Sequence, residues 1–359
     1  MITPDQPLKF KNGQGMKNRF MLAPMTNQQS HEDGTLSEEE FHWLTMRAKG
    51  QFGLVMTCAS HVQKIGKGFS GQLGIWNDSH LEGHERLANA IKAQDSLAVV
   101  QLHHAGMRSP KELIGEAPVC PSINEKTGAR ELTLEEVEQL KIDFILAAER
   151  AQKAGYDGVE IHGAHGYILA QFLSADINLR KDAYGGSLEN RSQLIFDIIE
   201  GIRQQCGADF LLGLRLSPER FGMKLSEVKW LVSEIIKMNQ VDFMDISLWD
   251  VFKEPVEKEE QHKSLLKHFT DLDFGDIKWT VAGNIASGND VSAVLQAGVD
   301  FVSIGKAGIL HHDFPQKVME DASFEAKATP VSKDYLIHEG LSPTFVNYMK
   351  RWPNFVIED

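Results

Sequence analysis

The sequence has few of the features that mark secreted, membrane-bound or cluster-binding proteins. Its 3 cysteines, Cys58, Cys120 and Cys206, stand far apart, so one chain can assemble neither a disulfide framework nor a four-thiolate iron–sulfur site. No apolar run approaches the ~20 residues that a membrane span requires. Residues 1–8 also lack the basic and apolar stretches of a targeting signal. These absences predict a cytoplasmic protein without a membrane span.

Positive charge is also scarce. The chain carries 37 Lys and Arg against 50 Asp and Glu, a formal net charge of -13. A negative field repels polyanions before contact, so nucleic acids and anionic membranes are excluded as partners and a small-molecule substrate is favoured. With 42% hydrophobic residues in 359, the chain has enough for one large core of a barrel of about 250 residues plus additions. No linker-like tract divides it, which predicts a single domain, 1–359, with a C-terminal extension at about 323–359.

Short β-rich apolar runs recur along the chain and alternate with stretches of helical periodicity. Three of the helical stretches are clear: 132–154, opened by Thr133 with Glu136 three residues on, 187–205 and 289–296. This alternation calls for parallel strands with helical crossovers, and eight such units close a barrel. We therefore predict an α/β fold, a (β/α)8 TIM barrel, with an N-terminal hairpin cap turning at Asn12-Gly13. The eight predicted strands are 20–23, 52–57, 97–102, 158–162, 211–216, 243–247, 279–282 and 301–304.

Working residues of such a barrel lie on the loops after the strands. Nearly every predicted strand end here offers a polar group or a glycine. The candidates are Pro24, Met25, Thr26, Ala59, Ser60, Gln101, His103, His104, His162, His165, Tyr167, Arg215, Ser247, Gly283, Asn284, Gly305 and Lys306.

Two of these strand ends suit a phosphate. Gly283-Asn284 and Gly305-Lys306 follow the seventh and eighth predicted strands, where bare glycine N–H groups can approach an anion and a cation can neutralise it. The alternative is that the glycines only make tight turns and that Lys306 is a solvated charge.

The run from His162 to Tyr167 places two imidazoles and a phenol just after an apolar strand. His162 and His165 can bind a metal, donate hydrogen bonds to a carbonyl oxygen, or be structural. No third ligand completes a metal site nearby, since Glu160 belongs to the strand itself, so we predict no metal. Tyr167 can deliver a proton to a developing carbanion if it is held within reach, although a lone loop tyrosine more often packs.

Gln101 and Arg215 stand at the ends of the third and fifth predicted strands. The Gln101 amide both donates and accepts, like the edge of a pyrimidine-type ring. Arg215 lies in an otherwise apolar run, and a buried arginine needs an anionic partner. That partner is either a ligand that gains negative charge, as a flavin does on reduction, or an internal carboxylate.

At this point the residues resemble a known family. The runs HGAHGY at 162–167, QFLS at 171–174 and YGGSLENR at 184–191 are similar to the Old Yellow Enzyme family of FMN-dependent ene-reductases, also called NADH:flavin oxidoreductases. The similarity extends over nearly the whole chain, including 18–20, 23–26, 102–106 and 304–306.

The resemblance implies an FMN flavoprotein that is reduced by NADH or NADPH and passes a hydride to an activated C=C bond, as in an α,β-unsaturated carbonyl. It implies that His162 and His165 grip the carbonyl oxygen and that Tyr167 protonates the α carbon. The implied cofactor-binding residues are Pro24, Met25, Thr26, Ala59, Gln101, His162 and Arg215 around the ring, and Gly283, Asn284, Gly305 and Lys306 around the phosphate. Lys306 stands where the family usually has arginine, so it brings charge without a bidentate fork.

Two other functions remain open. A metal-dependent barrel hydrolase would use His103, His162 and His165, and a non-catalytic barrel would bind a flavin or phosphosugar without turnover. We expect a homo-oligomer. For the C-terminal stretch there are two alternatives. In one, Arg351 and Trp352 reach a neighbouring subunit's site; in the other, the stretch is a solvated tail.

Overall fold

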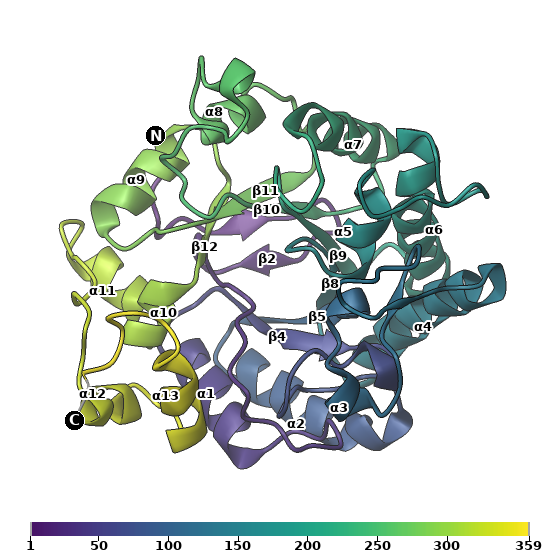
Figure 1. The fold of residues 1–359 in the computed structure, drawn as a ribbon. Helices are drawn as coiled ribbons and strands as arrows, with labels where there is room; N and C mark the ends of the chain where they lie inside the picture. The colour runs from purple at the N-terminus through teal and green to yellow at the C-terminus, as the bar shows by residue number, and fades with distance from the viewer. Residues whose placement is uncertain (1, 358–359) are drawn as a thin grey trace.

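The computed structural model describes residues 2–357, and eight of its strands close a parallel barrel (Figure 1). Around the barrel the order is β10-β11-β12-β3-β4-β5-β8-β9, and β9 pairs with β10 to close it. All eight predicted strands, and with them the TIM-barrel fold, are confirmed. Their bounds are β3 Phe20–Leu22, β4 Leu54–His61, β5 Leu97–His103, β8 Gly158–Gly163, β9 Leu211–Leu216, β10 Phe243–Ser247, β11 Lys278–Ala282 and β12 Phe301–Ile304.

Helices surround the barrel on its outer side (Figure 1). The three predicted helices are α4 Leu134–Lys153, α6 Leu188–Cys206 and α9 Gly288–Gln296. The capping box predicted from Thr133 and Glu136 opens α4. The other helices are α1 Glu38–Lys49, α2 Leu81–Lys92, α3 Lys111–Ile114, α5 Ile168–Leu173, α7 Leu225–Met238, α8 Leu265–Thr270, α10 Lys306–Leu310, α11 Phe314–Glu320, α12 Lys333–His338 and α13 Pro343–Met349. No helix within 2–357 is both long and apolar enough to cross a membrane.

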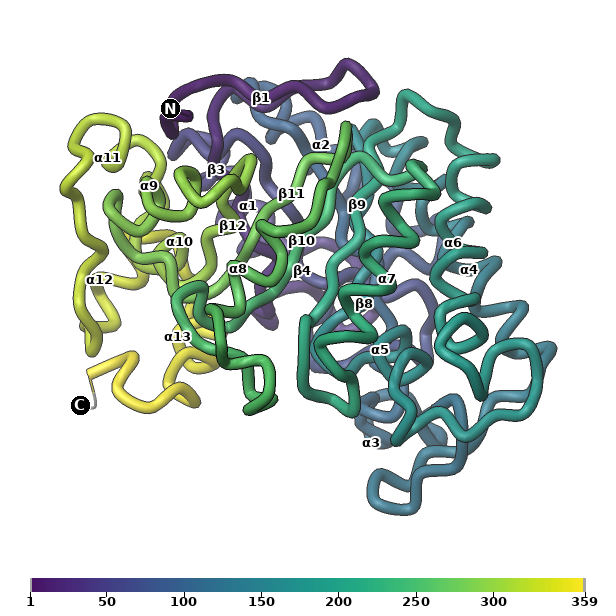
Figure 2. Tube along the Cα trace, turned by 90° about the horizontal axis from the view of Figure 1, so that it is seen from above, coloured from purple at the N-terminus to yellow at the C-terminus, as the bar shows by residue number. Residues whose placement is uncertain are grey.

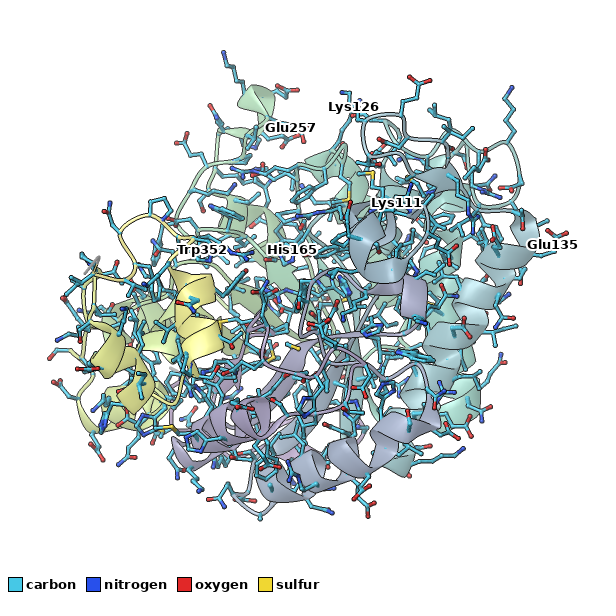
Figure 3. The ribbon with its side chains drawn as sticks, turned by 60° about the horizontal axis from the view of Figure 1, so that its bottom comes forward. Lys111, Lys126, Glu135, His165, Glu257 and Trp352 are labelled. Carbon is cyan, nitrogen blue, oxygen red and sulfur yellow. The ribbon has the colours of Figure 1, made fainter. Side chains whose placement is uncertain are left out.

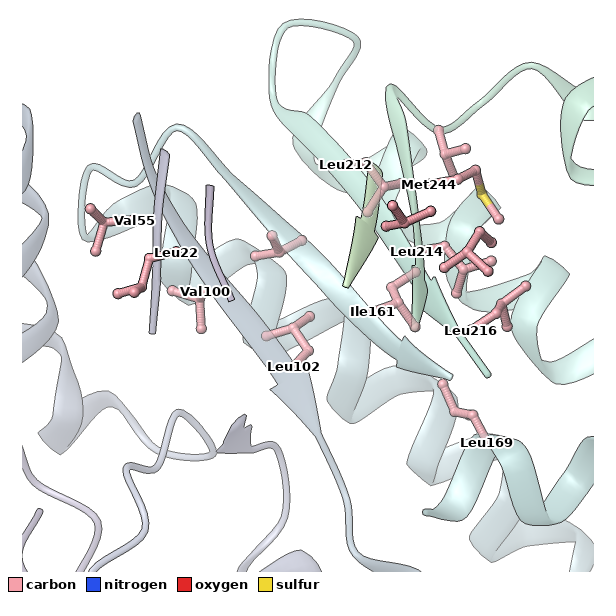
Figure 4. Packing of buried hydrophobic residues seen from close by; sticks show 14 of the residues in the cluster. Leu22, Val55, Val100, Leu102, Ile161, Leu169, Leu212, Leu214, Leu216 and Met244 are labelled. Carbon is pink, nitrogen blue, oxygen red and sulfur yellow. The ribbon is translucent and has the colours of Figure 1, made fainter. Parts of the chain in front are cut away.

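Each barrel strand buries alternate side chains on opposite faces, because successive residues of a strand point to opposite sides. On β9, for example, Leu212, Leu214 and Leu216 join the cluster between barrel and helices (Figure 4). Leu211 belongs to a second, smaller cluster inside the barrel. The outer layer carries most of the apolar burial, which leaves the barrel interior free for polar groups.

The predicted N-terminal hairpin is confirmed and closes one end of the barrel (Figure 2). It pairs β1 Leu8–Lys9 antiparallel with β2 Gly15–Met16. Between them Phe10 lies 6.0 Å, centroid to centroid, from both Phe243 and Phe301. Leu8, Phe10 and Met16 thus complete the apolar cluster at the amino ends of the strands.

Replacing Phe10 with alanine should destabilise the fold by about 3–5 kcal/mol, because it opens a cavity among aromatic rings that cannot close around it. Denaturant unfolding measures this free energy. Leu179→Ala, at a side chain 67% exposed, is the control and should change stability by less than about 0.5 kcal/mol. Equal small changes in both variants would show that the hairpin is not part of the core.

Above this apolar cluster the barrel interior is polar. Six fully or nearly fully buried polar residues occupy the inward positions of β5 and β8–β12: Gln101, Glu160, Arg215, Asp245, Thr280 and Ser303. They lie toward the carboxyl ends of the strands, opposite the hairpin. Buried polar groups need hydrogen-bond partners. The mouth directly above this polar layer is therefore the first place to look for a functional site.

The C-terminal extension is folded, so the expectation of a solvated tail is wrong for most of it. Helices α12 and α13 pack on α1, where the rings of Trp43 and Phe345 meet edge to face 5.4 Å apart. Leu336, Val346 and Met349 are buried with them. Within α13, Phe345, Val346 and Met349 lie on one buried face, as expected for residues three or four positions apart in a helix.

Candidate active site

His162, His165 and Tyr167 come together at the end of β8. The His162 ring centroid lies 5.1 Å from those of both His165 and Tyr167. Two consecutive residues with positive φ, His165 at 59° and Gly166 at 69°, fold the turn that brings them round. His165 lies near the middle of the molecule in the view of Figure 3. The structure therefore assembles the three predicted catalytic residues into one group.

His162 presents an N–H to the mouth. Its Nδ1 accepts a hydrogen bond from the Ala164 backbone N–H at 3.2 Å, so the ring proton resides on Nε2. Burial, followed by His165, His103 and Arg215 nearby, lowers the pKa of His162 well below its ordinary value. His162 is thus a neutral hydrogen-bond donor at physiological pH.

His165 is held by Ser247. The His165 Nε2 and Ser247 Oγ atoms are 2.8 Å apart, and Arg215 Nη2 lies 3.4 Å from the same Oγ. Ser247 can accept from Arg215 and donate its hydroxyl proton to His165 Nε2, and in that tautomer the ring proton of His165 is on Nδ1. Burial, and then Arg215 and Arg108, lower the pKa of His165 to about 3. This imidazole is also a neutral donor.

Binding of an uncharged carbonyl ligand should be independent of pH between pH 5 and 7. Both imidazoles have lowered pKa values, so neither takes up a proton until the pH falls well below that of a free histidine, about 6.5. Calorimetric titration with a non-ionisable cyclic enone at several pH values measures this. A loss of affinity centred near pH 6.5 would contradict the neutral assignment.

Tyr167 is packed between two imidazoles and a guanidinium. Its ring centroid is 4.4 Å from that of His103 and 4.7 Å from Arg108 Cζ. Arg108 also donates to the His165 carbonyl oxygen at 2.5 Å. Sequence reasoning missed Arg108, although its position shortly after β5 was a signal. It named His103 as a strand-end candidate and as a ligand in the hydrolase alternative, but gave it no role beside Tyr167. These contacts fix the phenol beside His162.

Arg215 has an internal partner, which is one of the two alternatives that the sequence left open. Its Nε lies 3.1 Å from Asp245 Oδ2 on the neighbouring strand. Gln101 is similarly engaged, since its Nε2 donates to Glu160 Oε2 at 2.6 Å. The burial of Arg215 therefore does not by itself require a ligand anion.

Pro24, Met25 and Thr26 follow β3 and are half-buried. The Tyr348 side chain of helix α13 lies beside Thr26, and burial raises the pKa of its hydroxyl, so the C-terminal extension borders the mouth. Ala59 lies on β4 beside Gln101 in register, and its carbonyl oxygen accepts from Gln72 at 2.7 Å. These residues line the side of the mouth formed by β3, β4 and β5.

The four phosphate candidates follow two paired strands, β11 and β12. At Gly283 an added Cβ would lie 2.8 Å from the backbone of Trp249 and Asp250, so this glycine is required for packing whatever it binds. Asn284 Nδ2 donates to Asp250 at 3.3 Å. Gly305 has more space, because a Cβ added there would meet only the Met25 sulfur, at 3.8 Å. Lys306 Nζ donates to Thr329 at 3.2 Å.

The mouth has the open space and the donors that a flavin needs. At the end of β12, Gly305 leaves space beside Met25, where an added Cβ would meet only the sulfur at 3.8 Å. His162 keeps a ring N–H that Ala164 does not use, and Arg215 brings a fixed positive charge to the end of β9. A closed barrel with a mouth of this kind fits an FMN-dependent oxidoreductase.

Comparisons with known proteins agree with this class of enzyme. The chain belongs to the NADH:flavin oxidoreductase / NADH oxidase family, whose model matches residues 6–325. It is 37% identical over 326 residues to the probable NADH-dependent flavin oxidoreductase YqiG of Bacillus subtilis (strain 168), covering 88% of this chain and 87% of that protein.

One solved structure and one further sequence relative are also similar to this chain. The old yellow enzyme homologue from Zymomonas mobilis superposes with a TM-score of 0.80 at 26% identity, over 96% of this chain and 98% of that one. The NADH:fumarate oxidoreductase of Klebsiella pneumoniae (strain 342) is 31% identical over 89% of this chain, which spans only 36% of that longer protein.

Two groups of possible metal ligands occur in the described part of the chain, Glu260 with His262 and His268, and His312 with Asp313 and Glu339. Neither contains His103, His162 or His165. Nothing in the geometry therefore favours the hydrolase alternative.

Proposed function

We propose that this protein reduces the activated C=C bond of an α,β-unsaturated carbonyl compound or a similar electrophile. The observation that carries the proposal is the group at the end of β8, where two neutral imidazoles and a phenol converge. Two neighbouring imidazoles that can donate hydrogen bonds and a proton source beside them match what this reduction requires of a protein.

Bound FMN supplies the redox chemistry, accepting a hydride from NADH or NADPH and giving it to the β carbon of the acceptor. The ring would lie against Pro24, Met25, Thr26 and Ala59 on one side of the mouth and Gln101, His162 and Arg215 on the other. The phosphate would be held by Gly283, Asn284, Gly305 and Lys306.

His162 and His165 bind the carbonyl oxygen of the acceptor through N–H groups. As negative charge moves onto that oxygen, these hydrogen bonds strengthen, so they stabilise the transition state more than the ground state. Because both rings are neutral and fixed by Ala164 and Ser247, they need no reorganisation. Tyr167 donates its hydroxyl proton to the α carbon and regains one from solvent, since its side chain is partly exposed.

Three further features of the protein remain proposals. One domain spans 1–359, supported by a C-terminal extension that packs on α1 and reaches Thr26. A cytoplasmic location is supported by three buried free cysteines. The homo-oligomeric state is a prediction from the sequence alone.

The test is direct. The purified protein should be yellow with stoichiometric FMN, NADH or NADPH should bleach it without oxygen, and cyclohexenone should restore the colour. Colourless protein that does not take up added FMN would refute the proposal. Bleaching without reoxidation by any enone or quinone would limit the protein to the non-catalytic alternative or to another acceptor class.

A further inference from the structure

Two buried carboxylates lie under the proposed flavin site and take no part in the steps above. Glu160 on β8 and Asp245 on β10 are both fully buried inside the barrel. Between them on β9 is Arg215, a cation close to both. Two carboxylates and one guanidinium leave a net negative charge if both acids are ionised.

The carboxyl oxygens are poorly supplied with donors. Glu160 Oε2 receives the Gln101 amide at 2.6 Å, but within residues 2–357 Glu160 Oε1 and Asp245 Oδ1 receive nothing. Asp245 Oδ2 is 3.1 Å from Arg215 Nε, close enough for an ion pair but outside hydrogen-bond geometry. An ionised carboxylate needs its lone pairs satisfied when it is buried, so this arrangement suits one acid that carries a proton.

Burial, and then Asp245, raise the pKa of Glu160 to about 8, against the opposing effects of Arg215 and Gln101. Burial also raises the pKa of Asp245, and Arg215 opposes this. The neutral form of Glu160 therefore predominates below pH 8, and its proton is lost as the pH rises above that value. Other polar groups inside the barrel, His103 and His162 with lowered pKa values and the hydroxyls of Thr280 and Ser303, are uncharged.

We propose that Glu160 and Asp245 form a proton-accepting pair, which takes up one proton from solvent when the cofactor above it gains negative charge on reduction. The inference rests on the proposed function, because it requires Gln101 and Arg215 to face the flavin. The step balances: the hydride from NAD(P)H brings two electrons and one proton to FMN, and one further proton converts a carboxylate of the pair to a carboxylic acid. Glu160 is the member that exchanges the proton, since Asp245 has the guanidinium beside it.

Arg215 connects the pair to the cofactor. It faces the proposed flavin site through Nη2, which contacts Ser247, and faces Asp245 through Nε. When negative charge appears on the cofactor side, Arg215 is shared between two anions, and a second carboxylate below it becomes less favourable. The proton taken up by Glu160 relieves that repulsion, and by linkage the proton favours reduction.

The experiment compares the FMN midpoint potential across pH 6–10 in the wild type, in Glu160→Gln and in a surface control, Glu200→Gln. Glutamine mimics the protonated acid and cannot exchange a proton. We expect the potentials of wild type and Glu160→Gln to coincide below pH 8, where Glu160 already carries its proton. Above pH 8 the wild type should fall about twice as steeply with pH, since two protons rather than one accompany two electrons.

A second measurement does not depend on a folded variant. Photoreduction of unbuffered wild-type protein at pH 9, followed with a pH indicator, should take up one proton per FMN beyond the value at pH 7. Parallel potential curves for wild type and Glu160→Gln, or equal proton uptake at both pH values, would overturn the inference while leaving the proposed function intact. Protein that binds no FMN would instead refute the proposed function.

Discussion

Replacing Tyr167 with phenylalanine should slow reoxidation of the reduced enzyme by an enone about 100- to 10,000-fold, the usual contribution of a positioned general acid. The substitution removes only the hydroxyl. The ring contacts with His103, His162 and Arg108 that hold residue 167 in place are retained. The geometry of the mouth should therefore survive, and only the proton source should be lost.

Reduction of the flavin by NADH or NADPH should be nearly unchanged in Tyr167→Phe, because hydride transfer to the cofactor needs no proton from this phenol. Stopped-flow measurement of the two half-reactions separates the effects within one variant, so each serves as the control for the other. Equal slowing of both half-reactions would remove Tyr167 from the acid role and leave it as a packing residue.

The second large effect is expected at His162. Replacing it with alanine removes a neutral N–H donor from the carbonyl site, and loss of one such donor costs about 10²- to 10³-fold in the rate of the step it stabilises. Affinity for phenols should fall as well, because a phenolate oxygen resembles the oxygen that gains charge in the reaction. Calorimetry measures the phenol affinity and stopped-flow the rate of reoxidation.

The conservative variant His162→Asn provides the matched comparison, since its amide can still donate a hydrogen bond from the same strand position. It should recover part of both effects. His42→Ala, at an exposed histidine on α1, controls for a change of a surface imidazole. Phenol affinity that is unchanged in His162→Ala would contradict the carbonyl-binding role.

The barrel could be predicted from the sequence alone because each strand is a short apolar run. Its outward side chains are buried under the surrounding helices. Leu212, Leu214 and Leu216 on β9 show this alternation, and the intervening Arg215 showed where the run turned polar. The capping box at Thr133 fixed the start of α4 to within a residue or two. Local patterns of this kind depend on a few adjacent residues, so they can be recognised without coordinates.

Partners across the barrel could not be predicted in the same way. The Arg215–Asp245 ion pair and the Gln101–Glu160 hydrogen bond join strands whose pairing register the sequence does not state. The contact between Thr26 and Tyr348 joins residues more than 300 positions apart. The helices α12 and α13 are short, and a short helix in an extension has too few turns for a clear periodic signal.

The most direct test of the proposed site is a crystal structure of the purified protein soaked with a phenol. We predict FMN across the barrel mouth, with the phenol stacked on it and its oxygen within hydrogen-bond distance of His162 Nε2 and His165 Nδ1. A mouth without flavin, or a phenol oxygen that contacts neither imidazole, would contradict the assignment of this mouth as the place where a flavin and a carbonyl oxygen meet.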